Sequence, residues 1–178
     1  MSNINILAIS GSLRPNSSNA AIIRQVTAFA PPGVTINQYN GLATLPHFNP
    51  DLDNDTPPAP VFELRTLLKA ADAVLICTPE YAFGVPGSLK NALDWTVSSG
   101  EFVDKPVALI TASSVGQNAH AALLLTLGAI SAKVADDAKL LIPFIRTKVN
   151  SDGEVIDEEV LQALKMVLKA LIGAINDQ

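Results

Sequence analysis

Short, continuously apolar runs that alternate with helix-like segments constrain the fold more than any other feature of this sequence. Runs such as Ala73 to Thr78 are rich in β-branched residues and are apolar almost without interruption. Strands covered on both faces have this pattern, because neither face meets water. The alternation predicts an α/β, three-layer architecture around a parallel sheet. The expected strands are Ile4 to Ile9, Val34 to Tyr39, Ala73 to Thr78, Val107 to Thr111 and Lys139 to Ile142.

Helix-like segments separate these strands and follow the last one. The final segment places Leu164, Val167 and Leu171 at spacings of three and four residues, which is typical of a helix with one buried face. The expected helices are Asn19 to Ala30, Pro60 to Ala70, Gly87 to Val97, Asn118 to Ala132 and Asp157 to Ile175. Since no repeat or linker interrupts the alternation, residues 1–178 are expected to form a single domain.

The charge of the chain limits its partners. A formal net charge of −5 disfavours a general nucleic-acid binder or a protein of anionic membrane surfaces. Pro106 to Ala132 carries no charged residue, but the polar run SSVGQNAH in its middle argues against a membrane span. Met1 to Asn5 has no basic residue and Cys77 is the single cysteine, so we expect a cytoplasmic protein without a secretory leader or disulfide.

The loop after the first expected strand has the composition of an anion site. It reads SGSLRPNSSN and joins hydroxyl and amide donors to one cation, Arg14, at the start of a helix. It lacks both the P-loop lysine and GxGxxG, so a terminal monophosphate is the expected ligand. An ordinary turn in which Ser18 or Asn19 caps the helix is the alternative. The expected donors are Ser10, Ser12, Arg14, Ser17, Ser18 and Asn19.

The loop after the third expected strand, TPEYAFGVPG, favours a flat ligand. Its prolines stiffen the backbone, and Tyr81 and Phe83 offer flat apolar faces. The alternative is a rigid loop whose aromatic side chains fill the core. Ligands of open parallel sheets bind beyond the carboxyl ends of the strands, so this loop and the phosphate loop are expected to meet there.

Two of these segments resemble the motifs of one known family. GSLRPNSSN is similar to the GSxRxxSxN loop, and TPEYAFGVPGSLKNALDW to the TPEYxxxxPGxLKNAxDW motif, of the NADPH-dependent FMN reductase family, which includes quinone, azo-dye and chromate reductases. The resemblance covers most of the chain. It implies a flavodoxin-like fold with five parallel strands in the order 2-1-3-4-5, bound FMN, and NADPH or NADH as hydride donor. It places the FMN phosphate on Ser10, Ser12, Arg14, Ser17 and Asn19, and the flavin ring along Pro79, Glu80, Tyr81, Ala82 and Phe83.

The loop after the fourth strand completes this expected site. The amides of Ser113, Ser114 and Gly116 would face the pyrimidine edge of the flavin, or would simply cap the next helix. The chain departs from many family members at Ala82 and Gly84, where they have Asn and Ser. It also lacks their glycine pair and arginine after strand four. The resemblance therefore leaves the ring-edge hydrogen bonds and the substrate preference open.

The sequence offers no acid–base or covalent machinery. His47 and His120 have no partners at metal-binding spacing, and Cys77 lies within an apolar strand. Hydride transfer through a flavin needs none, because the cofactor carries the chemistry. We expect an FMN-dependent NAD(P)H oxidoreductase that reduces quinones or similar small-molecule acceptors by a ping-pong mechanism. A non-enzymatic FMN electron carrier, or a nucleotide-processing transferase with Glu80 as its lone carboxylate, remains as an alternative.

A helix without charge indicates an oligomer. Asn118 to Ala132 has no charged residue on any face. Leu123 and Leu127 share one stripe, whereas Leu125 and Ala129 lie elsewhere around the helix. The sheet can cover only one of these faces, so we expect a homodimer or a dimer of dimers with this helix in the interface.

Overall fold

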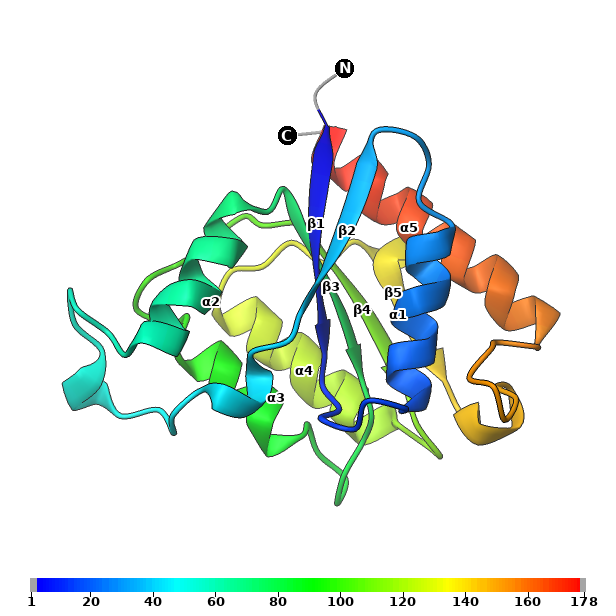
Figure 1. Ribbon diagram of the computed structural model, residues 1–178, viewed down its shortest axis with the longest axis horizontal. Helices are drawn as coiled ribbons and strands as arrows, with labels where there is room; N and C mark the ends of the chain where they lie inside the picture. The colour runs from blue at the N-terminus through cyan, green and yellow to red at the C-terminus, as the bar shows by residue number, and fades with distance from the viewer. Residues whose placement is uncertain (1–2, 177–178) are drawn as a thin grey trace.

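The computed structural model describes residues 3–176 and shows a parallel sheet between two layers of helices (Figure 1). The sheet has five strands in the order β2-β1-β3-β4-β5, and all neighbours run parallel. This confirms the three-layer α/β class and the flavodoxin-like strand order. The strands are β1 (Ile4–Ser10), β2 (Val34–Tyr39), β3 (Ala73–Thr78), β4 (Val107–Ala112) and β5 (Lys139–Ile142).

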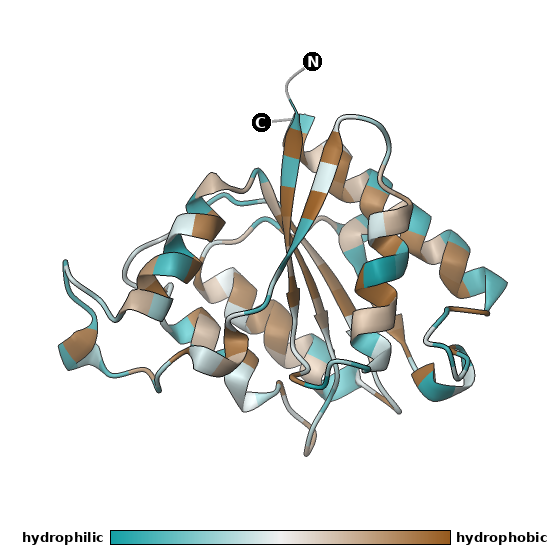
Figure 2. Cartoon of the chain, viewed as in Figure 1, coloured by the Kyte–Doolittle hydropathy of each residue, from teal (hydrophilic) through white to brown (hydrophobic). Residues whose placement is uncertain are grey.

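Five α-helices cover the two faces of the sheet. Figure 1 shows α1 and α5 on one face, and α2, α3 and α4 on the other, and the buried side chains form one apolar cluster on each face. All six residues of β3 and of β4 are buried, which explains why these strands read as continuous apolar runs (Figure 2). The helices are α1 (Ser18–Ala28), α2 (Ala59–Ala70), α3 (Gly87–Asp94), α4 (Gln117–Ala129) and α5 (Glu158–Asn176).

Two helices end three residues earlier than the sequence indicates, and α1 ends two residues earlier, at Ala28 in place of Ala30. We expected α3 to reach Val97 and α4 to reach Ala132, but they end at Asp94 and Ala129. Apolar residues continue past both ends, and Trp95 and Ile130 are buried in the core without continuing the helix. The sequence stays apolar beyond the helix ends because these residues are still buried in the core.

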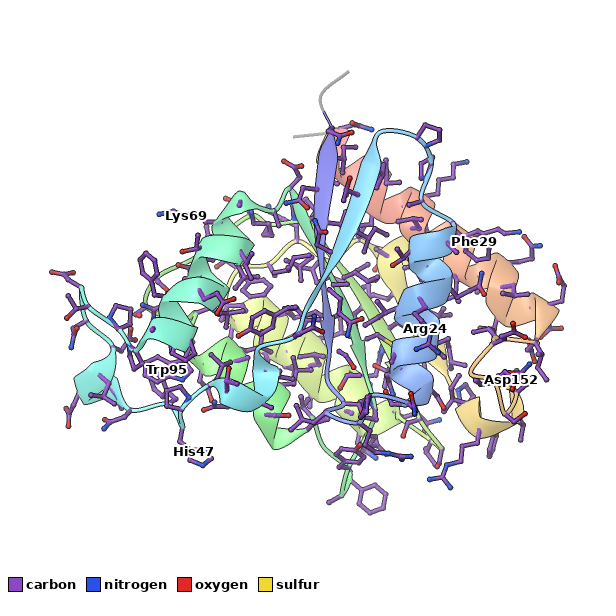
Figure 3. The ribbon with its side chains drawn as sticks, viewed as in Figure 1. Arg24, Phe29, His47, Lys69, Trp95 and Asp152 are labelled. Atoms are coloured by element: carbon purple, nitrogen blue, oxygen red, sulfur yellow. The ribbon has the colours of Figure 1, made fainter. Side chains whose placement is uncertain are left out.

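The long segment between β2 and α2 is fastened to α3. The side chain of Asn91 accepts a hydrogen bond from the N–H of Phe48 and donates one to the carbonyl of Pro46. The indole N–H of Trp95 donates to the same carbonyl at 2.9 Å, and Trp95 lies above His47 in the view of Figure 3. Asn91 and Trp95, two residues of the LKNAxDW motif, therefore stabilise the fold by fixing this segment against α3. None of the helices in residues 3–176 is both long and apolar enough to span a bilayer.

The carboxyl ends of β1 and β3 lie against each other. The N–H of Gly11 donates to the carbonyl of Cys77 at 2.8 Å. A Cβ at Gly11 would lie 2.3 Å from the Oγ1 of Thr78, so a side chain at this position would force the strands apart. This close approach starts the loops that follow β1 and β3 side by side.

Candidate functional site

A cleft of about 270 Å³ opens where the loops after β1, β3 and β4 converge. All but four of the expected site residues line it. A larger hollow, of about 940 Å³, opens at the opposite edge of the sheet beside Asp72 and Pro106, where parallel sheets do not place their ligands. The cleft is lined by Ser12, Arg14, Ser17, Ser18, Asn19, Pro79, Glu80, Tyr81, Ala112, Ser113, Ser114, Ile145 and Arg146.

Two serines of the first loop hold their hydroxyl protons free for a ligand. The Oγ of Ser12 accepts from the N–H of Arg14 at 3.3 Å, and the Oγ of Ser17 accepts from the N–H of Ala20 at 3.1 Å. Each hydroxyl acts only as an acceptor in these bonds, so its own O–H can still donate. Ser17 is therefore the N-cap of α1, in place of Ser18 or Asn19, and remains able to bind an anion.

The N-terminus of α1 adds backbone donors at the same point. Ala20 and Ala21 donate their N–H groups to Ser17. Among residues 3–176, no acceptor is found for the N–H groups of Ser18 and Asn19, the first two of the helix. Together with Arg14, these donors form a positively charged site at the N-terminus of α1 that suits an anion.

The structure corrects the expected roles of Ser10 and Asn19. The hydroxyl of Ser10 donates to the carbonyl of Ser12 and closes the turn, so it has no proton left for a phosphate. The side chain of Asn19 is buried, donates to the carbonyl of Ala112 and accepts from the thiol of Cys77 at 3.2 Å. Asn19 thus ties α1 to β3 and β4, and only its backbone N–H can face a ligand.

The carboxylate of Glu80 is committed to the fold. It accepts a hydrogen bond of 2.8 Å from the N–H of Ala119, in the first turn of α4. The N–H of Glu80 itself donates to the Oγ of Ser113 at 3.2 Å. These two hydrogen bonds tie the second loop to the third, and Oε2 of the Glu80 carboxylate takes part in holding the fold.

The tip of the second loop is a tight hairpin that projects from the cleft. Tyr81 and Gly84 exchange two backbone hydrogen bonds, and the residues between them, Ala82 and Phe83, have φ of 49° and 59°. Phe83 is 77% exposed and does not line the cleft, and neither does Ala82. The turn directs both outward from the cleft, and their contact with the flavin ring stays a prediction. Tyr81 keeps its place in the lining.

The third loop contributes less than expected. The N–H of Ser113 donates to the carbonyl of Ile142 at 3.2 Å, so it is not available to a ligand. Gly116, the N-cap of α4, has a φ of 94° and packs against β4 and β5, where a Cβ would lie 2.9 Å from Leu141. Gly116 lies outside the cleft, while Ser114 remains exposed in its lining.

Cys77, His47 and His120 do not line the cleft. Burial raises the pKa of the Cys77 thiol, which makes it unreactive. His120 is half-buried, its Nδ1 lies 2.9 Å from the Oγ1 of Thr111, and burial with nearby Lys139 lowers its pKa. Residues 3–176 contain no group of three or more His, Cys, Asp and Glu side chains able to hold a metal ion.

Sequence reasoning missed Arg146, which stands in the short 3-10 turn Ile145–Thr147 after β5 and lines the cleft. Its loop lacks the serines and glycines that identified the other three. The general rule that ligands bind beyond the carboxyl ends of parallel strands applies equally to the loop after β5, and would have brought Arg146 into view.

The flavodoxin-like strand order and the anion site at the N-terminus of α1 indicate a protein that binds a phosphorylated ligand. The chain belongs to the NADPH-dependent FMN reductase family, whose members its residues 4–147 match. It is 32% identical over 174 residues to the NAD(P)H-dependent FMN reductase PA1204 of Pseudomonas aeruginosa (94% of this chain, 93% of that protein). It is 33% identical over 177 residues to a quinone reductase of Escherichia coli, with the same coverage.

A solved structure agrees with this assignment. The flavoenzyme NAD(P)H:(acceptor) oxidoreductase FerB from Paracoccus denitrificans superposes with a TM-score of 0.85 at 28% identity, covering 98% of each chain. The chain is thus an enzyme that uses FMN and a nicotinamide hydride donor. The donors left unpaired around the N-terminus of α1 suit the single terminal phosphate of FMN.

Proposed function

We propose that the chain binds FMN with its 5′-phosphate at the N-terminus of α1 and reduces quinones or similar small acceptors with NAD(P)H. The observation that carries this proposal is the convergence of the Arg14 side chain, two unpaired helix amides and two serine hydroxyls in one cleft. Serine hydroxyls and N–H groups bind phosphate oxygens directly, and the guanidinium adds a charge-assisted contact.

The chain's own residues bind and orient, while the cofactor supplies the reactivity. The residues that line the cleft would hold FMN, and the bound flavin would supply the hydride and electron chemistry. Pro79 and Tyr81 form an apolar wall of the cleft beside the phosphate seat. Glu80, which also lines the cleft, uses Oε2 of its carboxylate to hold the N–H of Ala119. This geometry argues against the nucleotide-processing transferase, which needs that carboxylate.

We further propose that donor and acceptor use the same space above the flavin in turn. The test begins with purified protein and one equivalent of FMN, whose absorbance is followed under anaerobic conditions. Bleaching by NADPH or NADH, followed by recovery on quinone addition, supports the proposal. Double-reciprocal plots across several quinones should give parallel lines. A bound flavin that NAD(P)H leaves oxidised would instead support an electron carrier. Intersecting lines would indicate a ternary complex and would contradict the use of one space by donor and acceptor in turn.

The outer face of α4 supports a homodimer or a dimer of dimers. Leu123 and Leu127 are buried against the sheet, while Leu125 on the outer side is 78% exposed. Figure 2 shows α4 as apolar or neutral along most of its length, with hydrophilic residues near its start. A second copy of this chain matches such an uncharged face, since the same surface meets itself across a two-fold axis.

Sedimentation tests this assembly. Leu125→Glu should convert an oligomer at micromolar concentration into a monomer, because it places a charge in the interface. Met166→Glu is the matched control, since Met166 is 65% exposed on α5, on the opposite face of the sheet. A monomeric wild type, or a Leu125→Glu variant that assembles normally, would contradict this arrangement. We place the enzyme in the cytoplasm, where its nicotinamide donor is maintained.

A further inference from the structure

The four arginines of the chain divide into two pairs. Arg65 forms an ion pair of 2.6 Å with Asp53, and Arg24 donates to the carbonyl of Gly153 at 3.0 Å. Within residues 3–176, the guanidinium groups of Arg14 and Arg146 make no hydrogen bond or ion pair, and both line the same cleft. In a chain of net charge −5, two exposed guanidinium groups in one cleft, neither with a partner among the described residues, are suited to bind an anion from outside the protein.

The backbone that carries Arg146 is firmly held. Phe144 donates its N–H to the carbonyl of Ser114, and Ile145 donates its N–H to the carbonyl of Ser113, both at 3.1 Å. The side chain of Ile145 is buried in the core beneath α1 and α5. These contacts fasten the turn after β5 to the third loop, so Arg146 extends into the cleft from a fixed support.

Arg146 stands next to the N-terminus of α1. A second hollow, of about 330 Å³, shares Ser17, Ser18 and Arg146 with the cleft, and is otherwise lined by Arg24 and the loop that carries Asp152 (Figure 3). Since both hollows share these three residues, Arg146 lies where the two meet, at the end of the cleft formed by the start of α1. Arg14 approaches the same helix end from the loop after β1.

The charges of the cleft suit a dianion. Arg14 and Arg146 provide two positive charges, and the helix terminus adds a partial one. Glu80, the lone carboxylate in the lining, is turned to the N–H of Ala119. A phosphate monoester carries between one and a half and two negative charges near neutral pH, and so matches two guanidinium groups.

We propose that Arg146 is a second cationic ligand of the FMN 5′-phosphate. It contacts the phosphate from the turn after β5, whereas Arg14 contacts it from the loop after β1. This inference rests on the proposed function, because it assumes that FMN occupies the cleft. The GSxRxxSxN loop supplies one half of the phosphate seat, and the turn after β5 supplies the other half from a part of the chain that carries no recognisable motif.

Binding of FMN and of riboflavin, which lacks the phosphate, tests this inference directly. Arg146→Gln should raise the Kd for FMN by about tenfold, the effect of one charge-assisted hydrogen bond, and leave the Kd for riboflavin within about twofold. It should also reduce the salt dependence of FMN binding. Arg24→Gln is the control, since it removes a neighbouring charge that already has a partner, and should leave both constants within about twofold.

The possible results separate this inference from the function on which it rests. If the wild type binds no FMN, the proposed function fails with it. If Arg14→Ala weakens FMN binding while Arg146→Gln does not, only the role of Arg146 is overturned. An Arg146→Gln variant with wild-type FMN affinity but a raised KM for NADPH, and not for NADH, would assign this guanidinium to the 2′-phosphate of the nucleotide and overturn the proposal. Equal loss of FMN and riboflavin affinity would overturn it too.

Discussion

Glu80 and Ala119 join the second loop of the site to the helix that follows the third, through a carboxylate-to-amide hydrogen bond of 2.8 Å. The carboxylate satisfies one of the backbone donors at the start of α4 and places a negative charge at the positive end of that helix. The helix has no side-chain cap of its own, because its N-cap is Gly116. A residue expected to serve the ligand thus helps to hold the cleft in shape.

Removing this long-range cap should lower stability. Glu80→Ala should reduce the free energy of unfolding by about 0.5–2 kcal/mol, as for other helix caps, and Glu80→Gln should lose less because it keeps an acceptor. Urea denaturation of the FMN-free protein measures both changes. Asp55→Ala, at an exposed loop carboxylate, is the control and should stay within about 0.5 kcal/mol of the wild type. If Glu80→Ala is no less stable than this control, the cap does not contribute.

Glycine in place of Ala82, whose backbone lies in the left-handed region, should stabilise the protein. With a φ of 49°, Ala82 occupies a backbone conformation that costs a residue with a side chain about 1–2 kcal/mol. Ala82→Gly should therefore raise the free energy of unfolding by about 0.5–1 kcal/mol, after the added entropy of the unfolded chain is counted.

The same exchange at a helical position provides the comparison. Ala163→Gly, at a partly exposed position within α5 and away from the proposed interface, should lower stability by about 1 kcal/mol. Thermal melts of both variants should move in opposite directions. Destabilisation by both would show that the hairpin between Tyr81 and Gly84 is not strained.

Stability should depend on the protonation of His120. Burial, and then the charge of Lys139, lowers its pKa below the usual 6.5, so the unfolded chain binds a proton more readily than the folded one. Stability is therefore complete above about pH 6.5 and declines as the pH falls through and below that value. His120→Gln should show a smaller decline between pH 7 and pH 5, measured by urea denaturation. Equal slopes for both proteins would contradict this role.

The sequence predicted the fold well because burial leaves a periodic signal. The five strands were expected within one residue of their observed bounds, since both faces of β3 and β4 are covered and their apolar runs end where the sheet ends. The ends of α3 and α4 were less predictable. Trp95 and Ile130 are buried after the helices stop, and hydrophobicity does not distinguish a buried turn from a buried helix.

The site was predictable by loop but not by hydrogen bond. The rule on carboxyl ends of parallel strands selected the three loops that converge, yet Asn19 and Ser113 give their donors to neighbours that only the folded chain brings close. Ser10 gives its hydroxyl to a turn within its own loop. The sequence shows which residues can donate a hydrogen bond, but the acceptor that each donor meets depends on how the chain folds around it. Arg146 escaped notice for the complementary reason, because a lone arginine in an ordinary turn has no local signature.

The central claim is that the N-terminus of α1, with Arg14, holds the phosphate of FMN, and paired titrations of wild type and Arg14→Ala test it most directly. Calorimetry or quenching of flavin fluorescence should show that the variant binds FMN about tenfold to a hundredfold more weakly, corresponding to roughly 1.5–3 kcal/mol for a charge-assisted hydrogen bond. Riboflavin affinity should be nearly unchanged, and the melting temperature of the FMN-free protein should stay within a few degrees of the wild type. If Arg14→Ala weakens FMN and riboflavin equally, or neither, the phosphate does not bind where this account places it.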